Sequence, residues 1–131
     1  MAFMNNGSNH FTDANGATKQ TLVTAGVNGA IIRAIIATTD NGITARKVNL
    51  YINDGSTDRQ LAAVSIPINS GTNGVAAPVA VLSTRSIPGQ ISDSNGGFYL
   101  TLKATWLLKA NLDGNCDAGK TLNLLTFAED I

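Results

Sequence analysis

The sequence contains few of the residues on which many protein functions depend. Its 131 residues include one cysteine and one histidine, and charged residues make up only 14% of the chain. A single cysteine excludes an internal disulfide, and no spaced set of Cys and His residues suggests structural zinc. We therefore expect one domain held together by hydrophobic burial, which a chain of this length can provide.

Charge of either sign is scarce and balanced. Nine basic residues stand against nine acidic ones, so no basic stripe is available to neutralise a run of phosphates. The chain has no apolar run long enough for a membrane span and no signal-peptide pattern at its start. We expect a soluble protein that binds neither nucleic acid nor membrane. A surface rich in Asn, Thr, Gly and Ala suits packing against other protein, or is simply polar and uncharged.

The clearest pattern is an alternation of apolar and polar residues in the middle of the chain. Val48, Leu50 and Ile52 alternate with polar residues, which places them on one face of a strand. Residues Asp54–Asp58 then supply turn chemistry, and alternation resumes over Leu61–Ile68. The sequence therefore predicts a strand, a turn and a returning strand.

Similar patterns recur along the rest of the chain. We expect further strands at Thr21–Ala25, Ala30–Thr39, Val75–Leu82, Phe98–Lys103, Trp106–Leu112 and Lys120–Phe127. The stretch Ala30–Thr39 is also long enough for a helix, but its β-branched residues favour a strand. About eight or nine short strands with turns between them predict an all-β fold, an antiparallel β-sandwich with jelly-roll topology ahead of an immunoglobulin-like one.

Residues 1–19 differ from the rest, because they are polar and have too few apolar positions to define a face. We predict an extended N-terminal arm at 1–19 and a β-sandwich domain at 20–131. The large apolar residues of the arm are Phe3, Met4 and Phe11. We hypothesise that these three bind a neighbouring subunit or shell; the alternative is an arm folded back on its own domain.

No set of residues in the sequence indicates an active site. The only histidine, His10, lies in the arm, and Cys116 lies in a Gly/Asp turn without a nearby cation. Residues Asp113–Asp117 begin like a calcium loop, but Ala118 and Leu124 stand where the required glycine and glutamate should be. This segment is better interpreted as a hairpin turn. We expect no enzyme activity, no cofactor and no metal.

Two tyrosines are candidate surface contacts. By alternation, Tyr51 and Tyr99 point away from the apolar faces of their strands. Exposed tyrosines of this kind can form a carbohydrate platform or a protein contact. The alternative is an ordinary half-buried tyrosine in a sheet.

Three stretches resemble a family of small tailed-bacteriophage proteins, the head decoration or cement proteins. They are TAGVNGAIIRAIIATT (24–39), ARKVNLYINDGS (45–56) and AGKTLNLLTFAED (118–130). The resemblance implies a β-sandwich protein present in many copies on the outside of the virion capsid. It would be made in the host bacterial cytoplasm and would bind the major capsid protein, stabilising contacts between capsomers. A closed homo-oligomer is expected, a trimer ahead of a dimer.

Two other functions stay open at this point. One is a tail, neck or fibre-base component of the virion, which nothing in the sequence excludes. The other is a carbohydrate-binding β-sandwich module that would use the loop Ser83–Gly97 together with Tyr99.

Overall fold

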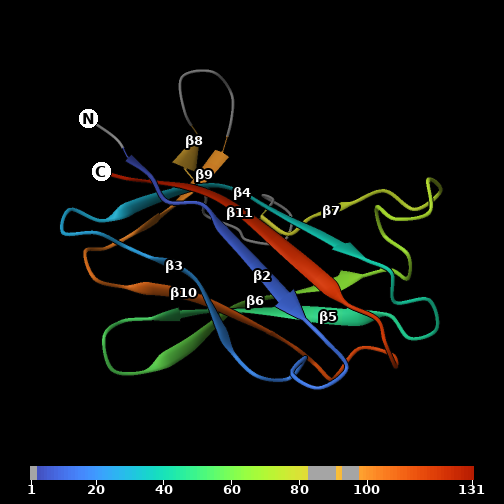
Figure 1. Cartoon of the computed structure of the whole chain (residues 1–131). Helices are drawn as coiled ribbons and strands as arrows, with labels where there is room; N and C mark the ends of the chain where they lie inside the picture. Colours follow the sequence, from blue (N-terminus) through green and yellow to red (C-terminus); the bar gives the residue numbers. More distant parts are fainter. Residues whose placement is uncertain (1–2, 83–90, 93–97) are drawn as a thin grey trace.

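The computed structural model describes residues 3–82, 91–92 and 98–131, and within these residues the protein is all β, without a helix (Figure 1). No helix of the described chain could therefore cross a membrane. The strands are β1 (Phe3–Met4), β2 (Gly7–Phe11), β3 (Gln20–Thr24), β4 (Ala30–Thr39), β5 (Arg46–Asn53), β6 (Asp58–Ile66), β7 (Val79–Ala80), β8 (Ile91–Ser92), β9 (Phe98–Leu102), β10 (Leu107–Leu112) and β11 (Leu122–Asp130).

The strands form two antiparallel sheets. The larger sheet has the order β1-β11-β4-β9-β8, with β2 also paired to β11 and β7 also paired to β4. The smaller sheet has the order β3-β10-β5-β6. The two sheets face each other as two layers (Figure 1). The expected antiparallel β-sandwich is confirmed, and its topology is compatible with a jelly roll.

The core lies between the sheets and is built by alternating side chains. In β11, Leu122, Leu124 and Thr126 are buried, whereas Leu125 and Phe127 point outward, as the alternation predicts. Full burial of a large apolar side chain contributes roughly 1.5–3 kcal/mol. The largest fully buried side chains are Phe11, Val23, Ile32, Ile35, Val48, Leu50, Ile66, Leu108, Leu112, Leu122 and Leu124.

Several predicted strands match the structure closely. Strand β4 has the bounds predicted for Ala30–Thr39, so the helical alternative was wrong, and β5 pairs with β6 as the predicted hairpin. The predicted strand Val75–Leu82 is shortened to Val79–Ala80. The residues up to Pro78 form a loop and not a strand. Proline lacks the N–H that pairing in a sheet needs, and the backbone at Gly71 and Gly74 has positive φ.

The connection after β10 is not the hairpin turn that we predicted at Asp113–Asp117. Strand β10 belongs to the smaller sheet and β11 to the larger one, so this connection crosses from one layer to the other. Asp113 accepts a hydrogen bond from Lys47 N at 3.1 Å, and Asp117 accepts bonds from Ile43 N and Thr44 N. The carboxylates thus hold two loops together at one end of the sandwich.

The N-terminal segment lies against its own domain. Strands β1 and β2 pair in succession with the same edge of β11, from Phe3 opposite Asp130 to Phe11 opposite Leu122 (Figure 1). Phe11 is completely buried. The expectation that Phe11 binds a neighbouring subunit is corrected accordingly, because burying this ring in its own core already removes it from water.

Candidate functional site

The outer face of β11 is the most apolar part of the described strands that remains exposed. Phe127 and Leu125 are 44% and 41% exposed, and Met4 of the neighbouring strand β1 is 82% exposed. Met4 and Phe127 also line a small cavity of about 160 Å³, together with Asn6, Arg33, Ala128 and Glu129. We call Met4, Leu125 and Phe127 the β11 outer face. Exposed apolar side chains grouped in this way are typical of protein contacts.

An ion pair borders this face. The Arg33 guanidinium donates to Glu129 Oε1 from Nη2 at 2.8 Å and from Nε at 3.2 Å. Both side chains are partly exposed, so the pair contributes little to stability but fixes the orientation of its long side chains. Phe3 belongs to the same edge through β1, whereas its side chain lies outside the described part of the structure.

The two tyrosines singled out in the sequence lie on different sheets. Tyr51 is in β5 of the smaller sheet, and Tyr99 is in β9 of the larger one; both are half-buried. The Lys19 ammonium lies 4.2 Å from the centroid of the Tyr51 ring, and the Arg33 guanidinium lies 5.2 Å from that of Tyr99. A cation therefore already occupies one face of each ring. The loop Ser83–Gly97 falls outside the described residues, except for Ile91 and Ser92.

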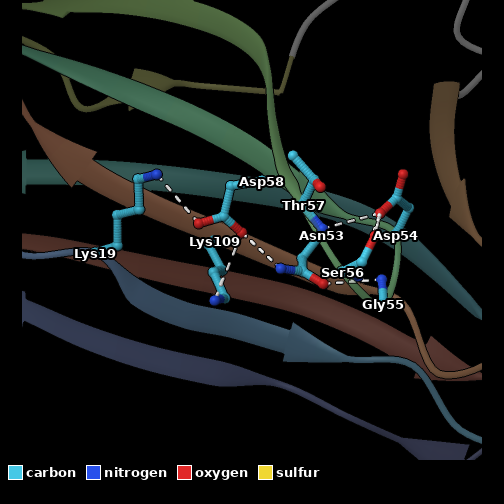
Figure 2. Close-up of polar contacts among 8 residues, drawn as sticks. All are labelled: Lys19, Asn53, Asp54, Gly55, Ser56, Thr57, Asp58 and Lys109. Atoms are coloured by element: carbon cyan, nitrogen blue, oxygen red, sulfur yellow. Dashed lines mark hydrogen bonds and ion pairs between the residues drawn. The ribbon is translucent and has the colours of Figure 1, made fainter.

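The tip of the β5–β6 hairpin carries a dense polar network (Figure 2). Asp54 Oδ1 accepts hydrogen bonds from Ser56 N, Ser56 Oγ and Thr57 N, and Asp54 Oδ2 accepts one from Arg59 Nε at 3.1 Å. The bonds from Thr57 N, Arg59 and Ser56 lower the pKa of Asp54 from 3.8 to about 2. Asp54 is thus a fixed carboxylate at neutral pH.

Asp58 links the hairpin to neighbouring strands on the outer face of the smaller sheet. It accepts a hydrogen bond from Asn53 Nδ2 at 2.8 Å and pairs with Lys19 at 3.1 Å and Lys109 at 3.6 Å (Figure 2). The bond from Asn53, followed by that from Lys19, lowers the pKa of Asp58. The two aspartates serve different partners, which agrees with their interpretation as turn residues and does not build a metal site.

A cavity opens beside the same hairpin tip. It has a volume of about 310 Å³ and is lined by Ile52, Asp54, Arg59, Gln60, Leu61 and Trp106. Sequence reasoning missed this grouping, because Trp106 is close to the hairpin only through the fold. The available signal was the presence of a single tryptophan, at the start of the predicted strand Trp106–Leu112.

The remaining candidates for chemistry, His10 and Cys116, have different surroundings. The His10 ring is exposed and bonds through Nδ1 with Asn123, whereas Cys116 is buried with its thiol directed at Phe11 O. Burial raises the pKa of Cys116, which keeps the thiol protonated. Across the described residues, no three His, Cys, Asp or Glu side chains gather as metal ligands would.

No protein-family model and no curated protein matches this sequence. Among solved structures, the chain is similar to one described as the "Cyanophage Pam1 capsid asymmetric unit". The sequence identity is 14%, the alignment covers 98% of this chain and 83% of that chain, and the TM-score is 0.47.

Proposed function

We propose that this protein is a non-enzymatic structural component of a tailed-phage virion, bound to the outer surface of the head as a decoration or cement protein. The observation that carries the proposal is the resemblance of residues 24–39, 45–56 and 118–130 to that family. These stretches contain β4, β5 and β11, the strands around which the two sheets are assembled. The resemblance therefore covers the framework of the domain.

The surface supports a role based on repeated protein contacts. The chain has few charges and no net charge, so it would approach another protein without large desolvation of ions. In this proposal the partner is the major capsid protein, and the β11 outer face, with Phe3 beside it, makes the contact. Many weak contacts repeated over a shell give strong attachment through avidity.

The first test is co-sedimentation of the purified protein with undecorated shells of its source phage. Saturation at a large copy number compatible with capsid symmetry supports decoration. Because the shells are already assembled, such binding also supports an exterior location. A few copies per particle would favour a tail, neck or fibre-base component instead, and no binding would contradict a virion contact of either kind.

Variants of the β11 outer face test which surface is used. Phe127→Ser should weaken shell binding by about tenfold or more, because a buried aromatic contact contributes roughly 1.5–3 kcal/mol. Ile43→Ser is the matched control, since Ile43 is 85% exposed and lies in a loop after β4, away from β1 and the outer side chains of β11. Equal affinities for the two variants would rule out the β11 outer face as the contact.

The contribution of the first residues to shell binding is tested with a deletion that is shorter than the whole arm 1–19. Removal of residues 2–6 eliminates Phe3 and Met4, and with them Asn5, but keeps Phe11 in the core, so the fold should persist with a lower stability. The proposal expects reduced shell attachment of this deletion, and undiminished attachment would contradict a role for the first residues.

A homo-oligomer is part of the same proposal. Light scattering on the purified protein should give a closed assembly, a trimer ahead of a dimer. A monomer at all concentrations would restrict oligomerisation to the shell surface.

A further inference from the structure

The cavity beside the β5–β6 hairpin joins an apolar floor to a polar rim. Ile52, Leu61 and Trp106 supply the apolar side chains, and all three also pack against the main core. Asp54 and Arg59 supply charged groups at the same cavity. Its volume of about 310 Å³ is at the small end of ligand pockets, which run from roughly 300 to 1,000 Å³. Most such pockets have this composition, with apolar walls and a few fixed polar groups.

The polar rim is organised before any ligand binds. Asp54 is held by its bonds to Ser56 and Thr57, and it fixes Arg59 through Nε. The two terminal nitrogens of Arg59 have no partner among the described residues, and the side chain is 71% exposed. The pocket therefore offers free hydrogen-bond donors next to a carboxylate that can accept further bonds, while the two opposite charges cancel.

The backbone next to the tryptophan is strained. Thr105, directly before Trp106, has a φ of 66°, a conformation that β-branched residues rarely adopt. The backbone of Trp106 is fixed on both sides, since its main-chain N–H donates to Lys103 O at 3.1 Å and its main-chain carbonyl accepts from Ala25 N at 2.9 Å. Strained residues of this kind are concentrated at binding sites, where the fold holds one side chain in a required place.

We propose that this pocket binds a neutral sugar ring of a glycan. A pyranose has an apolar face of C–H groups for the Trp106, Leu61 and Ile52 surface, and its hydroxyls both donate and accept hydrogen bonds. Arg59 would donate to one hydroxyl and Asp54 would accept from another. A charged ligand would find no net charge at the site, because Asp54 and Arg59 neutralise each other. A purely apolar ligand would bury both charged groups without replacing the hydrogen bonds that water makes to them.

This proposal is distinct from the tyrosine platform expected from the sequence, and it does not depend on attachment to a capsid. On a virion, the site would let the particle bind glycans displayed on a surface that it meets. The β5–β6 hairpin tip and the 113–117 connection lie at opposite ends of the sandwich (Figure 1). The loops around residues 113–117 therefore take no part in the proposed sugar site.

Trp106 is the only tryptophan in the chain, so its fluorescence reports directly on the pocket. The full-length protein is first applied to an array of mono- to hexasaccharides of glucose, galactose, mannose and N-acetylglucosamine in both anomeric linkages. Each sugar that binds is then titrated while the Trp106 emission is recorded. We expect a saturable change in emission for at least one sugar.

Arg59→Gln is the decisive variant, because it replaces the guanidinium and its terminal donors by a shorter, neutral amide at an exposed position without altering the core. It should weaken binding by about tenfold or more, the effect of losing a hydrogen bond to a charged group. Lys120→Gln removes an exposed cation elsewhere and should bind like the parent protein. Binding by no sugar on the array overturns the proposal, and so does binding that Arg59→Gln leaves unchanged.

Discussion

The Asn5 side chain, near the start of the chain, donates a hydrogen bond of 2.9 Å to Asp130, the residue before the last one. The same amide group donates to Thr24 O of β3 at 2.9 Å, and Asp130 also accepts from Gly26 N at 3.2 Å. Strand β3 belongs to the smaller sheet and β11 to the larger one. This pair therefore ties the N-terminal segment to both layers of the sandwich.

Asp130→Ala should lower the free energy of unfolding by about 1–3 kcal/mol, because it removes the acceptor of Gly26 N and leaves the Asn5 amide with Thr24 O alone. Urea denaturation of Asp130→Ala, Asn5→Ala and the double variant measures the coupling between the two residues. We expect the double variant to lose less than the sum of the single losses. Strict additivity would mean that the two side chains do not stabilise each other.

Phe11→Ala should be far more damaging than Met4→Ala. Phe11 is fully buried, so its truncation leaves a cavity and costs about 3–5 kcal/mol. Met4 is 82% exposed, and its truncation should change stability by less than about 0.5 kcal/mol. Chemical denaturation of the two variants checks this. Similar small losses in both would mean that residues 3–11 are not integral to the domain.

Thr105→Gly should increase stability by up to about 1 kcal/mol. A left-handed backbone costs an ordinary residue roughly 1–2 kcal/mol, and the greater flexibility of glycine takes back roughly 0.5–1 kcal/mol. Thr101→Gly, in strand β9, is the matched control and should reduce stability, because that position has extended backbone. Thermal denaturation should give shifts of opposite sign; a loss in both variants would refute the strain at Thr105.

The hairpin tip should make stability depend on pH in the acidic range. The pKa of Asp54 is lowered to about 2 in the folded protein, mainly by the bond from Thr57 N. A carboxyl group whose pKa is lower in the folded protein than in the unfolded chain stabilises the protein at pH values above the unfolded pKa. This contribution is lost as the pH falls from 3.8 to about 2.

Asp54→Asn should remove that contribution. Denaturation between pH 2 and pH 7 should show that the stability difference between the parent protein and Asp54→Asn shrinks below pH 3.8. A difference that stays constant over the whole range would contradict the role of the Asp54 carboxylate.

Local patterns predicted much of the secondary structure. Alternation gave the β5–β6 hairpin and the inward positions of Leu122 and Leu124, because a strand of fixed period places every second side chain on one face. The bounds of β4 came from its run of β-branched residues. Proline and glycine limited this approach. At 75–82 the apolar composition indicated a strand, but the turn residues before Pro78 shortened it to two residues.

The N-terminal segment was harder to interpret. A polar stretch such as 3–10 provides no apolar face of its own, and its pairing depends on β11, more than a hundred residues later. Its asparagines act through distant partners, as Asn9 does when its amide bonds Gln20 and Thr21 O. These bonds satisfy backbone groups between strands and leave no periodic signal in the sequence.

The sequence by itself determined an all-β protein with little charge, one cysteine and strands whose faces follow from alternation, because these properties depend on residue type and near neighbours. Only the tertiary structure decided that β1 and β2 lie along β11, that the 113–117 connection crosses between sheets, and that Trp106 meets Asp54 and Arg59 at one cavity. These arrangements rest on contacts between residues far apart in the chain, whose cost in loop closure is met by packing of the whole core.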